Sequence, residues 1–176
     1  TGRAIAHVEI EIRDDAGNDL PQGQSGEICV EGPQVMRGYW NRADETEKVM
    51  LPGDVLRTGD VGYMDPAGYV YIEDRKKDMI LVSGFKVFPN EVEDVLTMHP
   101  GVLEAGAIGV PDERWGERVA AVVQPHPGKS PTLDDLTAHC STRIGRYKLP
   151  RELHLVEEMQ RSPAGKADYT WARAVA

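Results

Sequence analysis

The chain changes character within Asp74-Arg75-Lys76-Lys77-Asp78-Met79-Ile80-Leu81-Val82-Ser83-Gly84-Phe85-Lys86. Three consecutive cations and an aspartate precede the apolar segment 79–82, which predicts a short strand, and the Ser-Gly pair after it predicts a turn. A solvated run of charges does not normally continue into an apolar strand. We therefore interpret 75–77 as the boundary between two domains, although no Gly/Ser-rich linker marks it.

The part of the chain before this boundary is rich in strands and turns. Residues 7–13 alternate between polar and apolar side chains, as a half-buried strand does. Two further apolar segments flank Asp65-Pro66-Ala67-Gly68, which predicts a β-hairpin with proline and glycine at favoured turn positions. Residues 1–74 are thus expected to form a small β-barrel-like subdomain.

Three helices are predicted from capping signals. A short helix over 43–50 would be capped by Asn41 or begun by the acidic residues of its first turn. Asn90 is expected to cap the helix that follows the boundary. Thr132 and Asp135 have the spacing of a capping box, which predicts the start of a third helix.

The part after the boundary alternates strands and helices. Further strands are expected near 104–110, 118–124 and 152–156, and a helix is expected at the carboxyl end. With the strand at 79–82 and the two capped helices, these elements predict a compact βαββαβ-type domain over 78–176. The fold class is therefore α+β.

Composition argues against several classes of function. The 176 residues carry a formal net charge of −9, whereas a general nucleic-acid surface needs clustered cations. No apolar run is long enough to cross a bilayer. Cys29 and Cys140 lack ligand spacing and are interpreted as reduced thiols of a cytoplasmic protein, so no metal site is expected. The chain begins with Thr1, and we expect it to be part of a longer protein.

A lysine near the carboxyl end lies on a Pro/Gly loop, Ser162-Pro163-Ala164-Gly165-Lys166. Activation of a carboxylate by ATP brings two anionic groups together, so a cation must neutralise the transition state. At about 4 Å and an effective dielectric near 20, such a pairing is worth roughly 4 kcal/mol before desolvation. Gly-Lys is also a common surface dipeptide, and alone it carries little weight.

A carboxylate and a guanidinium upstream could bind the sugar of the same nucleotide. Asp60, in Thr58-Gly59-Asp60, can accept hydrogen bonds from both ribose hydroxyls, as acidic residues do in dinucleotide sites. Arg75 could donate to the sugar or to phosphate through its planar fork. The alternatives are an ordinary turn for Asp60 and an exposed ion pair for Arg75.

Taken together, these segments resemble the C-terminal part of the adenylate-forming (AMP-binding) enzymes, a superfamily of acyl-CoA synthetases, luciferases and peptide-synthetase adenylation domains. The chain is most similar to the fatty-acyl-CoA synthetases, of the long-chain-fatty-acid–CoA ligase type, since peptide-synthetase domains usually differ after the equivalent of Arg75. The segments that carry the resemblance span nearly the whole chain in the family's order: Gly26–Trp40, Thr58–Asp60, Asp74–Glu93, Gly109–Glu113 and Gly165–Lys166.

The resemblance implies a role for each candidate residue in the chemistry of ATP. Asp60, Ile72 and Arg75 would bind the nucleotide, both as ATP and as the adenylate. Lys166 would be the lysine that acts in adenylation. The tail after Lys166 is less basic than in many fatty-acyl ligases and is similar to that of ligases for bulkier acids.

The resemblance also implies a moving domain. Lys77, within a hinge at 75–77, would allow the small domain 78–176 to rotate against the large N-terminal AMP-binding domain, of which 1–74 would be the end. One orientation would present the catalytic lysine. The other would present Ser83, Gly84, Phe85 and Lys86 to CoA.

The implied reaction is that of an acid–thiol ligase. A fatty or bulky hydrophobic acid would react with ATP to give acyl-AMP, and the acyl group would then pass to CoA. The ligands of Mg²⁺, the phosphate loop and the acyl pocket would all lie upstream of Thr1, so this chain alone is expected to be inactive. Two alternatives stay open: a ligase that passes the acyl group to a carrier protein, or an oxidising relative, and a non-catalytic α+β module that binds a partner or nucleotide.

Overall fold

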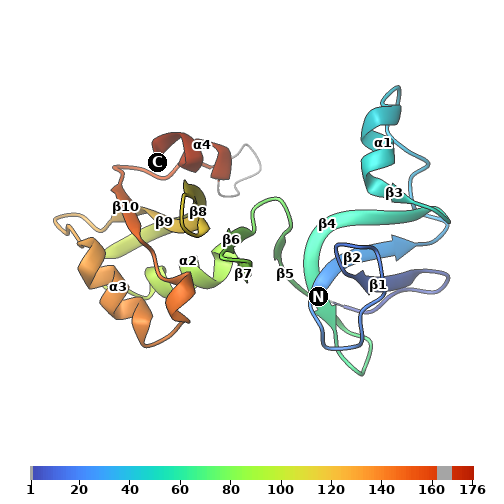
Figure 1. Cartoon of the computed structure of the whole chain (residues 1–176), viewed down its shortest axis with the longest axis horizontal. Coiled ribbons are helices and arrows are strands. Elements are labelled where there is room, and N and C mark those ends of the chain that lie inside the picture. Colours follow the sequence, from blue (N-terminus) through green and yellow to red (C-terminus); the bar gives the residue numbers. More distant parts are fainter. Residues whose placement is uncertain (1, 162–167) are drawn as a thin grey trace. The chain divides into compact units, whose positions relative to one another are not determined.

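The chain folds as two units that are joined between Lys77 and Asp78 (Figure 1). A computed structural model describes residues 2–161 and 168–176. Unit 1 is Thr1–Lys77 and unit 2 is Asp78–Ala176. Each unit combines one sheet with helices, so the predicted α+β class is confirmed. No helix in the described part of the chain is long and apolar enough to cross a membrane.

Unit 1 is a curled antiparallel sheet built around its longest strand, β4 (Figure 1). The sheet has the order β1-β2-β4-β3, and β5 pairs with the other part of β4. Register shifts interrupt both the β2–β4 and the β4–β5 pairs, and such bulges bend and twist a sheet. The elements are β1 (Glu9–Arg13), β2 (Gly26–Glu31), α1 (Ala43–Val49), β3 (Met50–Leu51), β4 (Val55–Met64) and β5 (Val70–Arg75).

Both faces of strand β2 are buried, whereas an alternating polar and apolar sequence predicts one buried and one exposed face. Ile28 faces a small apolar core that it shares with Ile12 and Val70. Its neighbours Glu27 and Cys29, on the opposite face, are also buried. A carboxylate buried in the middle of a sheet must be paired, and its partners prove important for the site.

The predicted hairpin between β4 and β5 is confirmed. The N–H of Gly68 donates to the carbonyl oxygen of Asp65 at 2.9 Å, and Gly68 has a φ of +81°. The Asp65 carboxylate also accepts hydrogen bonds from the N–H groups of Ala67 and Tyr69. This turn sets the β4–β5 register and hence the position of every residue on the two strands.

The acidic start predicted for α1 is confirmed, since Asp44 and Glu45 lie in its first turn, but Asn41 and Asn90 are wrong as caps. The N-cap of α1 is Arg42, with no side-chain capping bond, and Asn41 lies before it in the left-handed region. Helix α2 (Pro89–Thr97) begins one residue before Asn90, with Phe88 as its N-cap. Proline is favoured in the first turn because its missing N–H would be unpaired there and its φ is already helical.

Unit 2 is built around strand β9. This strand pairs antiparallel with β8 along its length. Its other edge pairs in parallel with β10 and, at its first residue, antiparallel with β6. The sheet has the order β10-β9-β6-β7 with β8 on β9. The remaining elements are β6 (Ile80–Val82), β7 (Phe85–Val87), β8 (Val102–Asp112), β9 (Gly116–Pro125), α3 (Leu133–Ser141), the 3₁₀ turn η1 (Arg146–Lys148), β10 (Glu152–Leu155) and α4 (Tyr169–Val175).

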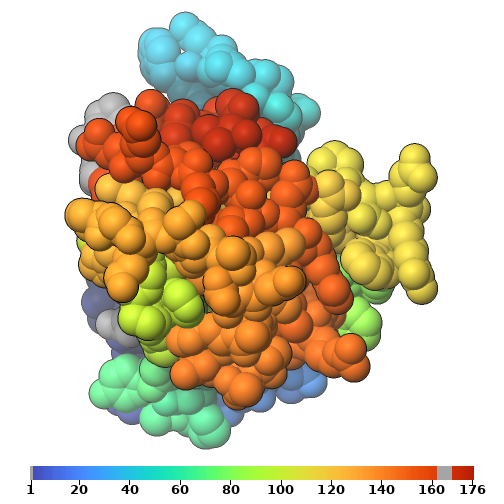
Figure 2. Space-filling model, turned by 90° about the vertical axis from the view of Figure 1, so that its left-hand side faces the viewer, coloured from blue at the N-terminus to red at the C-terminus, as the bar shows by residue number. Residues whose placement is uncertain are grey.

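Successive residues of β9 enter two different cores. Ala121 and Val123 pack with residues of α2 and α3, whereas Ala120 and Val122 pack with Met159 and with α4. In Figure 2 the red surface of α4 is distinct from the orange surface of α3. A strand with both faces covered has an unbroken apolar run, which explains the sequence of this strand.

The capping box of α3 is confirmed and gives a direct test of the fold of unit 2. Thr132 Oγ1 accepts a hydrogen bond from the N–H of Asp135 at 3.2 Å, and the Asp135 carboxylate accepts one from the N–H of Thr132 at 2.9 Å. We expect Thr132→Ala to lower the free energy of unfolding by about 1 kcal/mol. Urea unfolding followed by the fluorescence of Trp115 and Trp171 would measure the loss.

Ser130→Ala is the matched control, because Ser130 is exposed and precedes the helix. We expect this change to leave the urea midpoint of unit 2 unaltered. An equal loss in both variants would mean that the capping box does not stabilise α3.

Candidate functional site

Two of the predicted nucleotide ligands lie side by side in unit 1. Asp60 on β4 and Arg75 on β5 are register partners, and Arg75 Nε is 2.8 Å from Asp60 Oδ1. The side chain of Asp60 is 23% exposed and that of Arg75 is 53% exposed, so polar atoms of both remain accessible. Ile72, on the same strand as Arg75, is 51% exposed. The hairpin therefore presents a carboxylate, a guanidinium and an apolar side chain on neighbouring strands.

An ion cluster of Glu27, Arg57 and Lys76 lies next to this hairpin and stabilises it. Glu27 Oε2 accepts hydrogen bonds from Arg57 Nη2 at 2.6 Å and from Lys76 Nζ at 3.0 Å, and the Glu27 side chain is 6% exposed. Burial alone raises the pKa of Glu27, but the hydrogen bonds from Arg57 and Lys76 outweigh it and hold the pKa below its usual value. The cluster links β2, β4 and the segment that follows Arg75.

The two residues at the junction between the units differ in burial: Lys77 is exposed and Asp78 is buried. Lys77, the predicted hinge residue, is exposed. Asp78, next to it, is 5% exposed, and its Oδ1 lies 3.4 Å from Arg173 Nη2 of α4. The first residue of unit 2 is thus attached to the last helix of the same unit.

The predicted CoA-binding residues form the hairpin between β6 and β7. Ser83 and Gly84 have φ values of +50° and +82°, as a two-residue turn with the hairpin twist requires. The turn is held by the N–H of Ser83, which donates to the carbonyl of Trp115 at 2.8 Å. Phe85 is 58% exposed, and Lys86 is also exposed. These residues are therefore held at a fixed place on the surface of unit 2.

An open groove of about 270 Å³ lies beside this hairpin. Its walls combine aromatic rings with arginines. The rings of Phe85 and Tyr147 lie 5.0 Å apart, and the Arg151 guanidinium lies 5.3 Å from the ring centre of Trp115. The groove is lined by Val82, Ser83, Phe85, Trp115, Arg118, Val119, Arg146, Tyr147 and Arg151.

The arginines of this groove differ in their surroundings. Arg118 is ion-paired with Glu152 at 2.7 Å and with Asp112 at 3.3 Å, so its charge is largely matched. Arg146 and Arg151 are exposed. Aromatic planes beside exposed guanidinium groups suit a planar, anionic ligand.

Lys166 and Gly165 lie outside the described residues. The chain on either side of 162–167 is attached to unit 2. The N–H of Met159 donates to Gln124 Oε1 at 3.1 Å, and the hydroxyl of Tyr169 donates to Glu93 Oε1 of α2 at 3.0 Å. In the described part of the chain, no group of three or more His, Cys, Asp and Glu side chains is arranged to hold a metal ion.

Comparison with known proteins decides the family. The family described as the AMP-binding enzyme C-terminal domain matches residues 91–166, and the family described as AMP-binding enzyme matches residues 1–40. The chain belongs to the AMP-binding enzymes. It is 46% identical over 166 residues to the long-chain-fatty-acid–CoA ligase of Escherichia coli O6:H1, which confirms the resemblance drawn from the motifs.

Other relatives of this AMP-binding chain carry different names. It is 42% identical to the fatty acid–[acyl-carrier-protein] ligase ScoC of Streptomyces coeruleorubidus, over 94% of the chain and 32% of the relative. Among solved structures, ATP-bound MatB from Rhodopseudomonas palustris matches with a TM-score of 0.90 and 32% identity, over 99% of this chain and 35% of MatB. The match to the E. coli ligase covers 94% of this chain but spans only 29% of that ligase.

Sequence reasoning missed two features of the site. The first is the groove, because the motifs gave no binding role to Trp115, Arg146, Tyr147 or Arg151. A signal was present, since cations and an aromatic ring are interleaved over 146–151. The second is the ion cluster around Glu27, whose cationic partners are distant in sequence and give no local signal.

The lowered pKa of Glu27 predicts how the stability of unit 1 depends on pH. A carboxylate whose folded pKa is depressed stabilises the fold above its ordinary pKa of about 4.3, and this contribution is lost as the pH falls through the folded value. We expect Glu27→Gln to lower the free energy of unfolding by roughly 1–3 kcal/mol at pH 7. The difference from wild type should shrink at pH 3. Urea unfolding at the two pH values would measure it.

Glu45→Gln provides the control, because Glu45 forms exposed ion pairs with Arg42 and Lys48 on α1. Exposed pairs contribute little, so this variant should match wild type at both pH values. A Glu27→Gln deficit of the same size at pH 7 and pH 3 would contradict the electrostatic role of Glu27.

Proposed function

We propose that this chain is the C-terminal part of a longer enzyme, an ATP-dependent acyl-CoA synthetase. A carboxylate oxygen of a fatty or bulky hydrophobic acid attacks the α-phosphorus of ATP and releases pyrophosphate. The CoA thiol then attacks the acyl carbon, loses its proton and releases AMP. The observation that carries this proposal is the accessible Asp60–Arg75 pair, just before the junction of a chain 46% identical to a long-chain-fatty-acid–CoA ligase.

The Asp60–Arg75 hairpin suits the ribose of the nucleotide. A carboxylate can accept several hydrogen bonds at once, so Asp60 can hold both ribose hydroxyls while it stays close to Arg75. The remaining N–H groups of the Arg75 guanidinium can donate to the sugar or to a phosphate oxygen. Ile72 offers an apolar contact beside them. The similar protein MatB has been solved with ATP bound, which supports the same class of ligand.

Lys166 supplies the cation of the adenylation step in this proposal. Its ammonium group would neutralise the negative charge that builds up where carboxylate and α-phosphate meet. Mg²⁺ would screen the other phosphate charges, with ligands upstream of Thr1. Because the acyl pocket would also lie there, residues 1–176 alone would not catalyse the reaction.

The arginine-aromatic groove of unit 2 suits the nucleotide end of CoA. Adenine can stack on the rings of Phe85 and Tyr147, and the exposed Arg146 and Arg151 can neutralise phosphate groups. The Ser83-Gly84 turn at one wall has little side-chain bulk, so the thin pantetheine arm could pass close to the backbone. The groove and the CoA-binding residues predicted from the motifs thus coincide at this hairpin.

One lysine and one hairpin on the same unit must act in successive steps, so unit 2 would rotate about Lys77 between them. MatB supports such a movement. Its ATP-bound crystal structure matches this chain with a TM-score of 0.90, and its apo structure matches with 0.65, over 99% of the chain in both cases. The part of MatB that corresponds to this chain therefore differs in conformation between the two crystals.

A second candidate function is the transfer of the acyl group to a carrier protein. The observation in its favour is the 42% identity to the fatty acid–[acyl-carrier-protein] ligase ScoC. The two functions share the adenylation step and differ in the acceptor thiol. Measuring turnover with free CoA and with a phosphopantetheinylated carrier protein would separate them.

We expect Lys166→Ala in the full-length enzyme to slow adenylation by a hundredfold to a thousandfold. Thioester formation from supplied acyl-AMP and CoA should stay within about threefold of wild type, because that step does not use the lysine. Pyrophosphate release measures the first step and acyl-CoA formation measures the second. The isolated chain 1–176 should show neither activity above background.

Equal loss of both half-reactions in Lys166→Ala would contradict the role given to this lysine. Acyl-CoA formation by residues 1–176 alone would contradict the proposal that the chain lacks part of the active site. Lys129→Ala serves as the control, because Lys129 is an exposed lysine of unit 2 far from Lys166 in the sequence.

The groove predicts a specific defect in CoA binding. We expect Arg146→Ala and Arg151→Ala each to raise the KM for CoA about fivefold to twentyfold, with the KM for ATP unchanged, because each removes a phosphate-binding cation. Steady-state kinetics of the full-length enzyme would measure both constants. Arg42→Ala, which removes an exposed arginine of α1 in unit 1, should change neither. Unaltered KM values for CoA in both groove variants would rule out the groove as the CoA site.

A further inference from the structure

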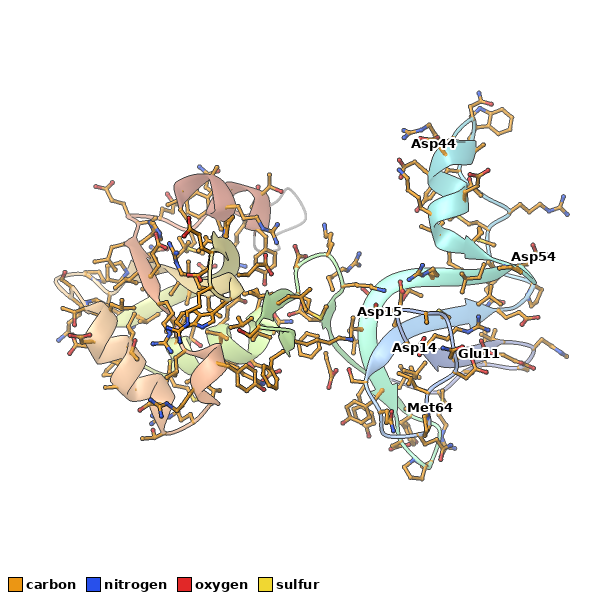
Figure 3. The ribbon with its side chains drawn as sticks, viewed as in Figure 1. Glu11, Asp14, Asp15, Asp44, Asp54 and Met64 are labelled. Atoms are coloured by element: carbon orange, nitrogen blue, oxygen red, sulfur yellow. The ribbon has the colours of Figure 1, made fainter. Side chains whose placement is uncertain are left out.

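Lys76, between the nucleotide-binding arginine and the proposed hinge residue, is held in place by three contacts. Its Nζ lies 3.0 Å from Glu27 Oε2 and 2.7 Å from Asp15 Oδ1. Its backbone N–H donates to the carbonyl oxygen of Gly59 at 2.8 Å. Figure 3 labels Asp15 on the loop after β1. Side chain and backbone of Lys76 are thus attached to three different segments of unit 1.

One of these three contacts is with a buried group. Glu27 lies on β2, which pairs with both β1 and β4, and its carboxylate is 6% exposed. Arg57 on β4 shares the same carboxylate oxygen at 2.6 Å. Moving Lys76 away would leave this buried carboxylate with a single cation, and an incompletely paired buried charge is costly. The sheet therefore resists displacement of Lys76.

The residue on the other side of the junction is attached to unit 2. Asp78 is 5% exposed and pairs with Arg173 of α4, and Ile80, which opens β6, is 1% exposed. Between these attached neighbours lies Lys77, which is exposed. A rotation of one unit against the other would thus be taken up by the backbone dihedral angles around Lys77.

This arrangement bears on nucleotide binding because Arg75 directly precedes Lys76. If Lys76 could move, changes in backbone dihedral angles would spread to Arg75 and alter the 2.8 Å contact between Arg75 Nε and Asp60 Oδ1. With Lys76 fixed, Arg75 and Asp60 keep their geometry in both orientations of unit 2.

We infer that Lys76 is a positioning residue that isolates the nucleotide-binding pair Asp60–Arg75 from the rotation about Lys77. It acts through its contacts with Glu27 and Asp15 and does not itself touch the substrates. This inference rests on the proposed function. Lys76 would affect the binding of ATP and would not take part in either chemical step.

Kinetics of the full-length enzyme test this inference through Lys76→Met, which keeps the length of the side chain and removes its charge. We expect the KM for ATP to rise about tenfold, which corresponds to about 1.4 kcal/mol. The KM for CoA and the rate of thioester formation from supplied acyl-AMP should stay within twofold. Lys76→Arg, which keeps the cation, should restore most of the affinity for ATP.

Lys48→Met is the matched control, because Lys48 forms an exposed ion pair with Glu45 in the same unit. It should leave every kinetic constant unchanged. Should Lys76→Met fail to fold, Asp15→Asn replaces it, since Asp15 is an exposed partner and its loss leaves the pair with Glu27 intact. We expect a twofold to threefold rise in the KM for ATP in that variant.

The outcomes separate this inference from the proposed function. An unchanged KM for ATP in the folded Lys76→Met enzyme, or in Asp15→Asn where Lys76→Met does not fold, overturns the positioning role. So does an equal rise in the KM values for ATP and CoA, because general loosening of unit 1 would affect both. Failure of the proposed function would show itself in the wild-type enzyme, as an absence of ATP-dependent acyl-CoA or acyl-carrier formation.

Discussion

The pairing of the buried Glu27 carboxylate is the interaction on which unit 1 depends. The Glu27 side chain is 6% exposed, and a buried carboxylate is stable only when cations pair with it. Arg57 and Lys76 are these cations. Because the two cations come from β4 and from the segment after β5, the pairing holds three parts of the sheet together. The same pairing holds Lys76, the residue directly after Arg75, so the stability of unit 1 and the position of the Asp60–Arg75 pair depend on one cluster.

In its described residues, unit 2 is stabilised by apolar packing and not by a buried ion cluster of this kind. Its central strand β9 is covered on one face by α2 and α3 and on the other by α4, so it is stabilised chiefly by apolar burial. The β6–β7 hairpin is attached to the start of this strand through the Ser83–Trp115 hydrogen bond. The groove of arginines and aromatic rings thus lies on a firm support, which suits a binding surface made of loops and short turns.

Local patterns predicted most of the elements, and their failures have physical causes. The hairpin at Asp65–Gly68 and the capping box at Thr132 depend on neighbouring residues, and both were correct. Asn41 and Asn90 do not cap their helices, because Asn41 adopts a left-handed conformation and the proline before Asn90 already starts the helix. The burial of both faces of β2 has no local signal, because the cations that pair with Glu27 are distant from it in sequence.

The sequence by itself indicated the family, the α+β class and the two residues Asp60 and Arg75 as candidate ligands of one nucleotide, because these follow from local motifs and their order. Tertiary structure alone decided which charges meet. Glu27 and Lys76 are 49 positions apart, and the groove draws its walls from the β6–β7 hairpin, β9 and the η1 region. Such contacts depend on the register in which distant strands pair and on which side chains that pairing buries, and no local pattern encodes either.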